Sequence, residues 1–335
     1  MKNILTVRAC KHFIFFMTYA IIIFWIDSDN GITLAATTTY PSRAVTLIVP
    51  QAAGGTSDFV ARVIAGPLSV DYGQQFIVEN RPGAGGNIGT QTAAKAQPDG
   101  YTLLVTVSTH AINAAIYKEL PYDPINSFAP IMLIAKVPFL LVVHPSVPVN
   151  SVADLIAYAK QTQEQLTYAS AGNSTINHLL GEMFKSMTGI NMLHIPYRGV
   201  ADATNNVLGG HVKISFASMP SVLSQVNEDK LRAIGISSAH RSAAAPNIPT
   251  IGETVNGYSA DLWVGLFGIA GTPTEIVNGL HANMAKILAT PSIRDGLKAQ
   301  GAELIASTPE QLAATLKEDL EKWAQVVKSS GAKVD

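Results

Sequence analysis

Three segments rich in glycine and hydroxyl side chains each follow a short run of β-branched residues, where a strand would pass into a helix. The first covers residues 50–58 and reads PQAAGGTSD. Gly54 and Gly55 let the backbone approach a bound group closely, and free N–H groups at the start of a helix carry partial positive charge. Thr56 or Ser57 can cap that helix or donate a hydroxyl. The segment is therefore a candidate anion site, and its closing aspartate is expected to compensate the helix dipole.

The second segment covers residues 80–89 and reads NRPGAGGNIG. It fails the dinucleotide pattern G-x-G-x-x-G, because Ile88 stands where the last glycine belongs. The chain also has no G-K-[ST] sequence, so a phosphate-binding P-loop is excluded and no cofactor is expected. A turn with several positive φ angles would explain the glycines by itself. Ligand contact by Gly85 and Gly86 and a purely structural role both remain open.

The third segment covers residues 170–178 and reads SAGNSTINH, repeating the order of small residues, glycine, hydroxyls and helix. It misses the nucleophile elbow G-x-S-x-G, because Ile176 occupies the last position. His178 lies about one helical turn from Ser174, so it is expected either to hydrogen-bond that serine or to support the loop. A serine nucleophile is the weaker of these interpretations. Two facing helix N-termini, from the first and third segments, would hold a carboxylate without an arginine.

The remaining composition excludes several classes of function. The net charge is −1 and no basic stripe appears, which argues against a nucleic-acid partner. The histidines form no H-E-x-x-H motif and no cluster with carboxylates, so no metal site is predicted. Apolar residues make up 47 % and charged residues 14 % of the chain, as expected for the large interior of an α/β fold.

Strand and helix patterns alternate along the chain in two sets. The first set has strands at 45–49, 76–78, 101–105 and 128–134, with helices at 58–69 and 88–96. The second set has strands at 139–143, 166–170, 192–196, 212–216 and 231–236, with helices at 151–160, 175–187, 201–208 and 221–227. A strand at 266–270 and two helices introduced by Thr272-Pro273 and Thr308-Pro309 end the chain. Apolar strands separated by helices predict parallel sheets covered on both faces.

The strand count predicts two lobes joined by two chain crossings. The chain would leave the first lobe near residues 135–138 and return near 255–263, which gives five strands to each lobe. A hinge of this kind leaves a cleft between α/β lobes, and a ligand is expected there. The predicted boundaries are 37–136 plus 262–335 for lobe 1 and 137–261 for lobe 2.

Residues 1–36 are interpreted as a secretory signal peptide. Basic residues precede an apolar run at 13–26, and small residues end near Ala36, where cleavage is expected. The run is shorter than the roughly 20 residues of a membrane span, although an uncleaved anchor is the alternative. Cys10 precedes the run, so it is not placed as a lipoprotein cysteine. The expected location is the periplasm.

Several segments together carry a resemblance to a known family. They read YPSRAV (40–45), VENRPGAGGN (78–87), PDGY (98–101), LPYDP (120–124), YASAGN (168–173), PYRG (196–199), GLF (265–267) and AGTP (270–273). In these the chain resembles the Bug-type, or TctC-like, extracytoplasmic solute receptors of tripartite tricarboxylate transporters. The resemblance covers essentially the whole chain after residue 36.

The resemblance implies an α/β, type II periplasmic-binding fold with two lobes of mainly parallel sheets around a central cleft. It implies a small carboxylate ligand, held largely by backbone amides, hydroxyls and ordered waters. It also implies delivery to integral-membrane transporter subunits, and the chain is expected to act as a monomer. Carried onto this sequence, the binding positions are Gly54, Gly55, Thr56, Ser108, Thr109, His110, Ser170, Asn173, Ser174 and Thr175, with Tyr197 closing the pocket.

This chain departs from the family pattern at two places. Gln51, Ala52 and Ala53 stand where the family usually carries an aromatic residue and prolines, and the amide of Gln51 suits a hydroxylated or amide-bearing acid. Ala217 stands where an aspartate is common, which argues against an amino-acid ligand. A periplasmic sensor subunit for a signalling kinase and an α/β hydrolase are the alternatives to a transport receptor.

Overall fold

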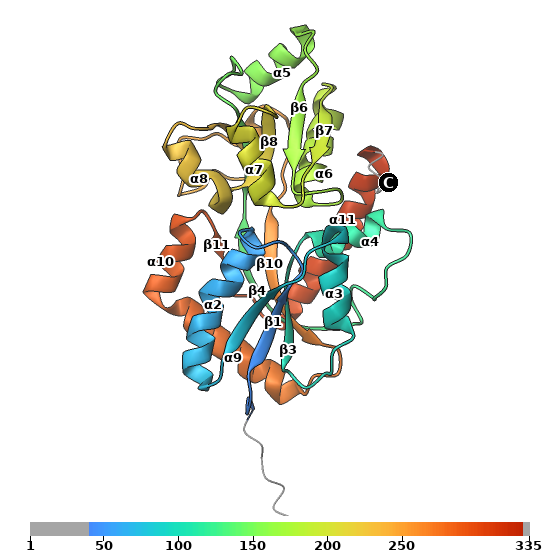
Figure 1. Ribbon diagram of the computed structural model, residues 1–335, viewed down its shortest axis with the longest axis vertical. Coiled ribbons are helices and arrows are strands. Elements are labelled where there is room, and N and C mark those ends of the chain that lie inside the picture. The colour runs from blue at the N-terminus through green and yellow to red at the C-terminus, as the bar shows by residue number, and fades with distance from the viewer. Residues whose placement is uncertain (1–39, 331–335) are drawn as a thin grey trace, which may run out of the picture. The chain divides into compact units, whose positions relative to one another are not determined.

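The computed structural model describes residues 40–330 (Figure 1). The predicted signal peptide, its cleavage near Ala36 and the position of Cys10 lie outside the described residues. Within residues 40–330, none of the helices is long and apolar enough to cross a membrane.

The first of two sheets contains six strands. Its strands are β1 (Val45–Val49), β2 (Phe76–Asn80), β3 (Thr102–Val107), β4 (Phe128–Val137), β10 (Leu262–Ile269) and β11 (Glu303–Leu304), and their order is β11-β4-β10-β3-β1-β2. β1 pairs in parallel with β2 and β3, whereas β10 runs antiparallel to β3 and β4. Every residue of β10 is buried, as expected for a central strand covered on both faces.

Helices begin directly after the first three strands of this sheet and again near the end of the chain. They are α2 (Thr56–Tyr72), the short 3-10 helix η1 (Ala84–Gly86), α3 (Asn87–Ala94), α4 (Thr109–Ile116), α9 (Thr274–Ala289), α10 (Pro291–Ala299) and α11 (Pro309–Ser330). The α2, α3 and α4 helices therefore all start at the same edge of the sheet, where β1, β2 and β3 end.

The second sheet has five strands in the order β7-β6-β8-β5-β9. Its strands are β5 (Phe139–Val143), β6 (Thr167–Ser170), β7 (Leu193–Pro196), β8 (Ile214–Ser218) and β9 (Arg232–Ile236). Its helices are α5 (Val152–Gln161), α6 (Ile176–Thr188), α7 (Val200–Leu208), α8 (Met219–Asn227) and the 3-10 helix η2 (Ile251–Glu253). β6 pairs in parallel with β7 and β8, and β5 runs antiparallel to β8 and β9.

The chain passes between the sheets twice, and one serine joins the two passages. Only Pro138 separates β4 from β5, and the return passage runs through Ala260 into β10. The fully buried Ser237 hydroxyl accepts a hydrogen bond from Phe139 N at 2.9 Å and donates to Ala260 O at 2.6 Å. The backbone of Ser237 also bonds to both residues. The two passages therefore form one hydrogen-bonded unit.

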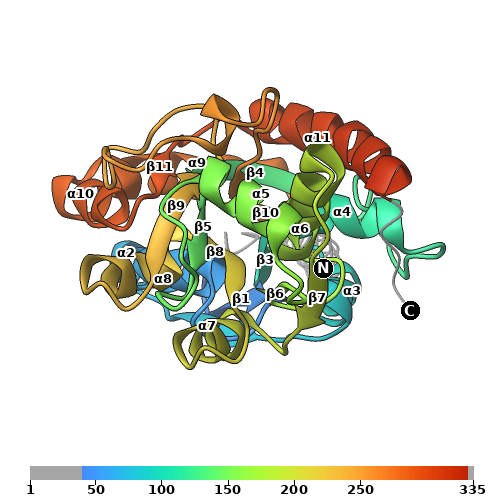
Figure 2. The ribbon, with the colours of Figure 1, turned by 90° about the horizontal axis from the view of Figure 1, so that it is seen from above.

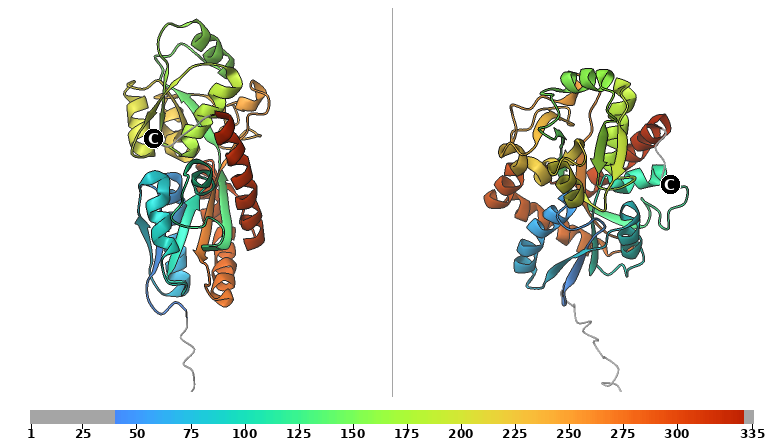
Figure 3. Two further views of the ribbon diagram at one scale, coloured as in Figure 1. Left: turned by 90° about the vertical axis from the view of Figure 1, so that its right-hand side faces the viewer. Right: turned by 45° about the horizontal axis from the view of Figure 1, so that its top comes forward.

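The last helix packs against both halves of the molecule. α11 contacts β4 and α4 of the first sheet and α6 of the second. Figure 2 shows it beside α4 and α6, and Figure 3 (left) shows it running past the junction of the two halves. Leu312, Leu316 and Trp323 form its buried face, as their spacing predicts. Trp263 Nε1 in β10 donates to Asp319 Oδ2 of α11 at 2.6 Å.

Side-chain caps are present at Ser151 and Thr308 but not at Thr272. Ser151 Oγ accepts from Asp154 N at 3.0 Å. Thr308 and Gln311 exchange side-chain and backbone hydrogen bonds, which completes a capping box. Thr272 does not cap α9, because its hydroxyl donates to Ile269 O at 2.7 Å and Pro273 takes the N-cap position.

The α/β class is confirmed, and the structure corrects three details. Both sheets are mixed. In the first sheet β10 runs antiparallel to its neighbours, and in the second sheet β5 does the same. In both cases the chain enters the strand from the opposite half of the molecule. The first sheet has six strands instead of five, since the two-residue β11 joins its edge. The α4 and α10 helices were not predicted at all. The residue boundaries of the lobes stay a prediction.

Candidate functional site

A cavity of about 1030 Å³ lies between segments of the first sheet and segments of the second. From the first sheet it is lined by the residues that follow β1 and β2 and by the start of α4. From the second it is lined by the residues that follow β6, the β7–α7 turn and the start of α7. The three glycine-rich segments identified in the sequence all border it.

The first segment presents an uncapped helix to this cavity. α2 begins at Thr56, and its N-cap Gly55 has extended backbone and supplies no side-chain hydrogen bond. The N–H groups of the first turn therefore lack the side-chain acceptor that usually satisfies them. Gly54 N donates to Asp58 Oδ2 at 2.9 Å, and Arg62 pairs with Asp58 Oδ1 at 2.9 Å. Burial raises the pKa of Asp58, but these bonds outweigh it and the pKa lies below its ordinary value.

Gln51 is held from two sides at the start of the same segment. Its Oε1 accepts from Ser57 Oγ at 2.8 Å, and its backbone oxygen accepts from Asn80 Nδ2 at 3.1 Å. Among residues 40–330 its Nε2 has no hydrogen-bond partner, and the side chain lines the cavity. A β-carbon on Gly86 would lie 3.2 Å from this Nε2, so glycine there makes room for the amide.

The second segment is shaped by its glycines, which explains them without a cofactor. Gly85 has φ 63° and Gly86 has φ 97°. A β-carbon on Gly85 would lie 3.1 Å from Asn113 Oδ1 and 3.5 Å from Ser174 Oγ of the opposite half. Asn113 Nδ2 donates to Gly85 O at 3.0 Å and to Asn87 Oδ1 at 2.7 Å. Both glycines border the cavity, so their role is at least partly structural.

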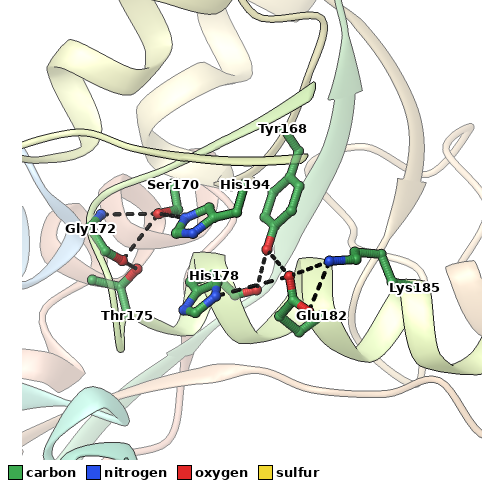
Figure 4. Close-up of polar contacts among 8 residues, drawn as sticks. All are labelled: Tyr168, Ser170, Gly172, Thr175, His178, Glu182, Lys185 and His194. Atoms are coloured by element: carbon green, nitrogen blue, oxygen red, sulfur yellow. Dashed lines mark hydrogen bonds and ion pairs between the residues drawn. The ribbon is translucent and has the colours of Figure 1, made fainter. Parts of the chain in front are cut away.

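The third segment uses its hydroxyls to bind its own backbone (Figure 4). Thr175 Oγ1 donates to Gly172 O at 2.7 Å, so the N-cap residue of α6 leaves the helix N–H groups uncapped. Ser170 Oγ accepts from Gly172 N at 3.1 Å and lies 2.6 Å from His194 Nε2. Gly172 has φ 128°, a conformation that only glycine adopts readily. α6 therefore offers a second helix N-terminus with no side-chain cap.

His178 does not hydrogen-bond Ser174, which corrects one sequence-based interpretation. Its ring stacks on His194 with centroids 4.0 Å apart and 9° between the planes. Ser174 has φ 64°, which places its side chain against Gly85 instead of over α6. Burial lowers the pKa of His178, and burial together with His178 lowers the pKa of His194 to about 3. Both rings are therefore neutral at ordinary pH.

A second polar contact lies beside this stack in α6. Glu182 accepts from Tyr168 OH at 2.6 Å and from Lys185 Nζ at 2.8 Å (Figure 4). Burial raises the pKa of Glu182, but the bonds from Lys185 and Tyr168 prevail and lower it. The nearest carboxylate to His178 is therefore already paired, with 4.0 Å between His178 Nε2 and Glu182 Oε1.

Many of the candidate site residues lie on the cavity wall, and the others lie behind or beside it. Those on the wall are Gln51, Gly55, Thr56, Gly85, Gly86, Thr109, Asn173, Thr175 and Tyr197. Those buried behind it are Ser108, His110, Ser170, Ser174 and Ala217, whereas Gly54 is exposed and borders a neighbouring pocket. Direct ligand contact stays a prediction for the first group and is not favoured by the geometry for the second.

Most of the residues behind the wall are occupied by internal contacts, and the buried Ser174 hydroxyl is the exception among them. Ser108 Oγ accepts from Trp263 N at 3.0 Å. His110 Nε2 bonds to Pro124 O at 2.8 Å, and burial lowers the pKa of this histidine to about 4. Ala217 belongs to the apolar core of the second half. Since α4 begins at Thr109, Ser108 and His110 point away from the cavity while the threonine borders it.

Several residues that line the cavity were not predicted from the sequence. Asn177 lies within the third segment, so its position was available from the sequence. Arg198 and Asp202 are the charged side chains on the cavity wall, and both are exposed. Phe139 and Leu262 line it where the two chain passages begin and end, a place that the hinge argument indicates. Within residues 40–330, no group of three or more His, Cys, Asp or Glu side chains is placed to hold a metal ion.

A family profile described as "Tripartite tricarboxylate transporter family receptor" matches residues 60–332. The chain belongs to this receptor family. Its fold is similar to that of the periplasmic binding protein BugD, with a TM-score of 0.83, 35 % identity, and coverage of 88 % of this chain and 99 % of that one. The family resemblance seen in the sequence and the two-lobed type II fold are thereby confirmed.

Two further solved structures that are similar to this receptor contain ligands. The protein Rpa4515 of R. palustris, solved with adipate, has a TM-score of 0.85 and 37 % identity, covering 88 % of this chain and 100 % of that one. MatC of Rhodopseudomonas palustris, solved with bound malate, has a TM-score of 0.81 and 28 % identity, covering 86 % and 100 %. Both ligands are dicarboxylates.

Proposed function

We propose that this chain is a periplasmic receptor that captures a small organic acid and delivers it to the membrane subunits of a tripartite tricarboxylate transporter. The observation that carries the proposal is the pair of helix N-termini without side-chain caps, α2 from one half and α6 from the other, that border one cavity. Helix N-termini carry partial positive charge and unsatisfied N–H groups, which together favour a carboxylate.

The hydroxyls on the wall strengthen this preference. Thr56 and Thr109 line the cavity, and neither hydroxyl has a hydrogen-bond partner among the described residues. Because these donors are fixed by helix starts and by buried packing, little entropy is lost when a ligand carboxylate binds them. A carboxylate can therefore be held by neutral donors, with charged side chains only at the exposed part of the wall.

The relatives support the class of ligand and the location. Two solved proteins that match this chain over their whole length hold adipate and malate, and a third is a periplasmic binding protein. Export through the segment before Ala36 fits that location. Delivery to membrane subunits is proposed from membership of the receptor family.

Ligand-dependent melting tests the proposal. A ligand that binds only the folded state raises Tm by mass action, so the correct acid in a panel of mono-, di- and tricarboxylates is expected to stabilise the protein. Gly55→Val should abolish the shift, because its side chain would enter the cavity beside the α2 N-terminus. The fold should stay intact in this variant, because Gly55 has an ordinary φ of −84° and a β-carbon there would lie 3.4 Å from Ala52 O. Gly66→Val on the exposed face of the same helix is the matched control.

The outcome that contradicts the proposal is a panel in which no carboxylate shifts Tm. We also propose that the protein is not a hydrolase, since Ser174 Oγ has no histidine partner and is fully buried. Turnover of an ester panel that disappears in Ser174→Ala would overturn that part.

A further inference from the structure

Asn177 presents a buried acceptor to the cavity, and its orientation is fixed. Its Nδ2 donates to Phe216 O at 2.7 Å. A carbonyl oxygen can only accept, so the amide cannot be flipped, and Oδ1 must face the other way. Asn177 is 6 % exposed and lines the cavity, and no described residue donates to its Oδ1. Water that enters the cavity can bond to this oxygen, which is not fully buried. A ligand that fills the cavity displaces that water and must then supply a donor, because an acceptor left without one is costly.

Several other free polar groups on the cavity wall are donors. They are the N–H groups at the starts of α2 and α6, the hydroxyls of Thr56 and Thr109, and Gln51 Nε2. Ser218 also lines the cavity, but its hydroxyl is engaged with Ser221. An ionised carboxylate offers only acceptors, so it can satisfy the donors and leaves Asn177 Oδ1 unpaired.

We propose that the ligand carries a hydroxyl group in addition to its carboxylate, and that Asn177 and Gln51 select for it. Asn177 Oδ1 accepts the hydroxyl proton, and Gln51 Nε2 donates to a ligand oxygen from the opposite half. The inference rests on the carboxylate-receptor function proposed above and narrows it to hydroxy acids. An ammonium group would also donate to Asn177, but the one carboxylate on the wall, Asp202, is exposed and lies in α7.

Isothermal titration with matched acids tests this selection. The pairs are succinate and malate, glutarate and 2-hydroxyglutarate, and butyrate and 3-hydroxybutyrate, with both enantiomers of each hydroxy acid. At least one hydroxy acid is expected to bind about 10-fold more tightly than its parent acid, the value of one well-formed hydrogen bond at a site that is otherwise left unpaired. Aspartate serves as the amino counterpart of succinate.

Two variants assign the effect to residues. Asn177→Leu should reduce the ratio of hydroxy-acid to parent-acid affinity toward 1, while affinity for the parent acid changes less than about 3-fold. Gln51→Met keeps the length of the half-buried side chain and should reduce the ratio in the same direction. Gln75→Met, an exposed glutamine outside the cavity, is the control and should leave the ratio unchanged. If Asn177→Leu does not fold, the affinity ratios of Gln51→Met and of the wild-type protein still test the selection for a hydroxyl group.

Equal affinities within every pair in the wild-type protein overturn the inference, and so does tighter binding of aspartate than of malate. An unchanged ratio in both variants overturns the roles of Asn177 and Gln51. Failure of every acid to bind is a different result, because it overturns the receptor function itself.

Discussion

The turn after β1 and the turn after β6 have the same pattern of residue types but use their hydroxyls differently. Thr56 leaves its hydroxyl free at the cavity, whereas Ser170 and Thr175 both bind the backbone of Gly172. Gly55 has ordinary extended backbone, and Gly172 has φ 128°. The turn after β1 is therefore open to a ligand, and the turn after β6 is held in shape before one arrives.

The largest expected difference between the turns concerns their glycines. Gly172→Ala should lower the free energy of unfolding by about 1–3 kcal/mol, because φ 128° is strained for alanine and a β-carbon would lie 3.3 Å from Tyr197 O. Gly55→Ala should change it by less than about 1 kcal/mol. Urea unfolding of both variants measures this, and equal losses would mean that the two turns do not differ in rigidity.

The hydroxyls give the next contrast. Ser170→Ala should cost about 1–3 kcal/mol of stability, because it leaves Gly172 N and His194 Nε2 without their buried partner. Thr56→Val should change stability by less than about 0.5 kcal/mol but weaken carboxylate binding about 10-fold. Thermal melts and titration calorimetry separate the two effects. A Thr56→Val protein that is destabilised but binds the ligand normally would show that this hydroxyl supports the fold and not the ligand.

The pH dependence of stability has the same sign at the two turns but covers different pH ranges. The pKa of His194 is lowered to about 3 in the folded protein, so below the unfolded value near 6.5 the unfolded state takes up protons first. The neutral His194, which bonds to Ser170 at the turn after β6, therefore makes its full contribution to the free energy of unfolding above about pH 7. This contribution falls as the pH falls toward 3. Asp58 in the turn after β1 also has a lowered pKa, and its contribution is lost only below about pH 4.

His194→Gln tests this pH range, since glutamine can keep a hydrogen bond to Ser170 but does not titrate. Its free energy of unfolding should fall less between pH 7 and 4 than that of the wild-type protein. Urea unfolding across that range is the measurement. Identical pH profiles would show that the stacked histidines do not contribute to acid sensitivity.

The smallest expected effect concerns the support of Gln51. Ser57→Ala removes the hydroxyl that holds Gln51 Oε1 and frees the side chain to rotate. Ligand affinity should fall about 2- to 5-fold with stability changed by less than about 1 kcal/mol. Asn80→Ala, which removes the bond to the backbone oxygen of Gln51, should affect affinity less than Ser57→Ala, because it leaves the amide held. A larger loss of affinity in Asn80→Ala than in Ser57→Ala would show that the backbone hydrogen bond, and not the side-chain bond, positions Gln51 for the ligand.

Alternation of apolar strands and amphipathic helices was enough to predict most elements of the fold. The sequence did not predict α4, because THAINAAI spans only eight residues, or β11, which exists only by pairing with β4. In the site, residue types located the three turns correctly. The direction of each side chain depended on backbone angles and on contacts with the other half, as for Ser174 against Gly85.

The packing of α11 has a consequence for how the protein melts. This helix contacts β4 and α4 of one half and α6 of the other, so neither half can lose its structure without exposing part of the same helix. Buried surface shared in this way couples the unfolding of the two halves. We expect a single calorimetric transition, in which the calorimetric and van't Hoff enthalpies agree, despite the two separate sheets. The C-terminal helix then acts as the thermodynamic link that makes two sheets melt as one domain.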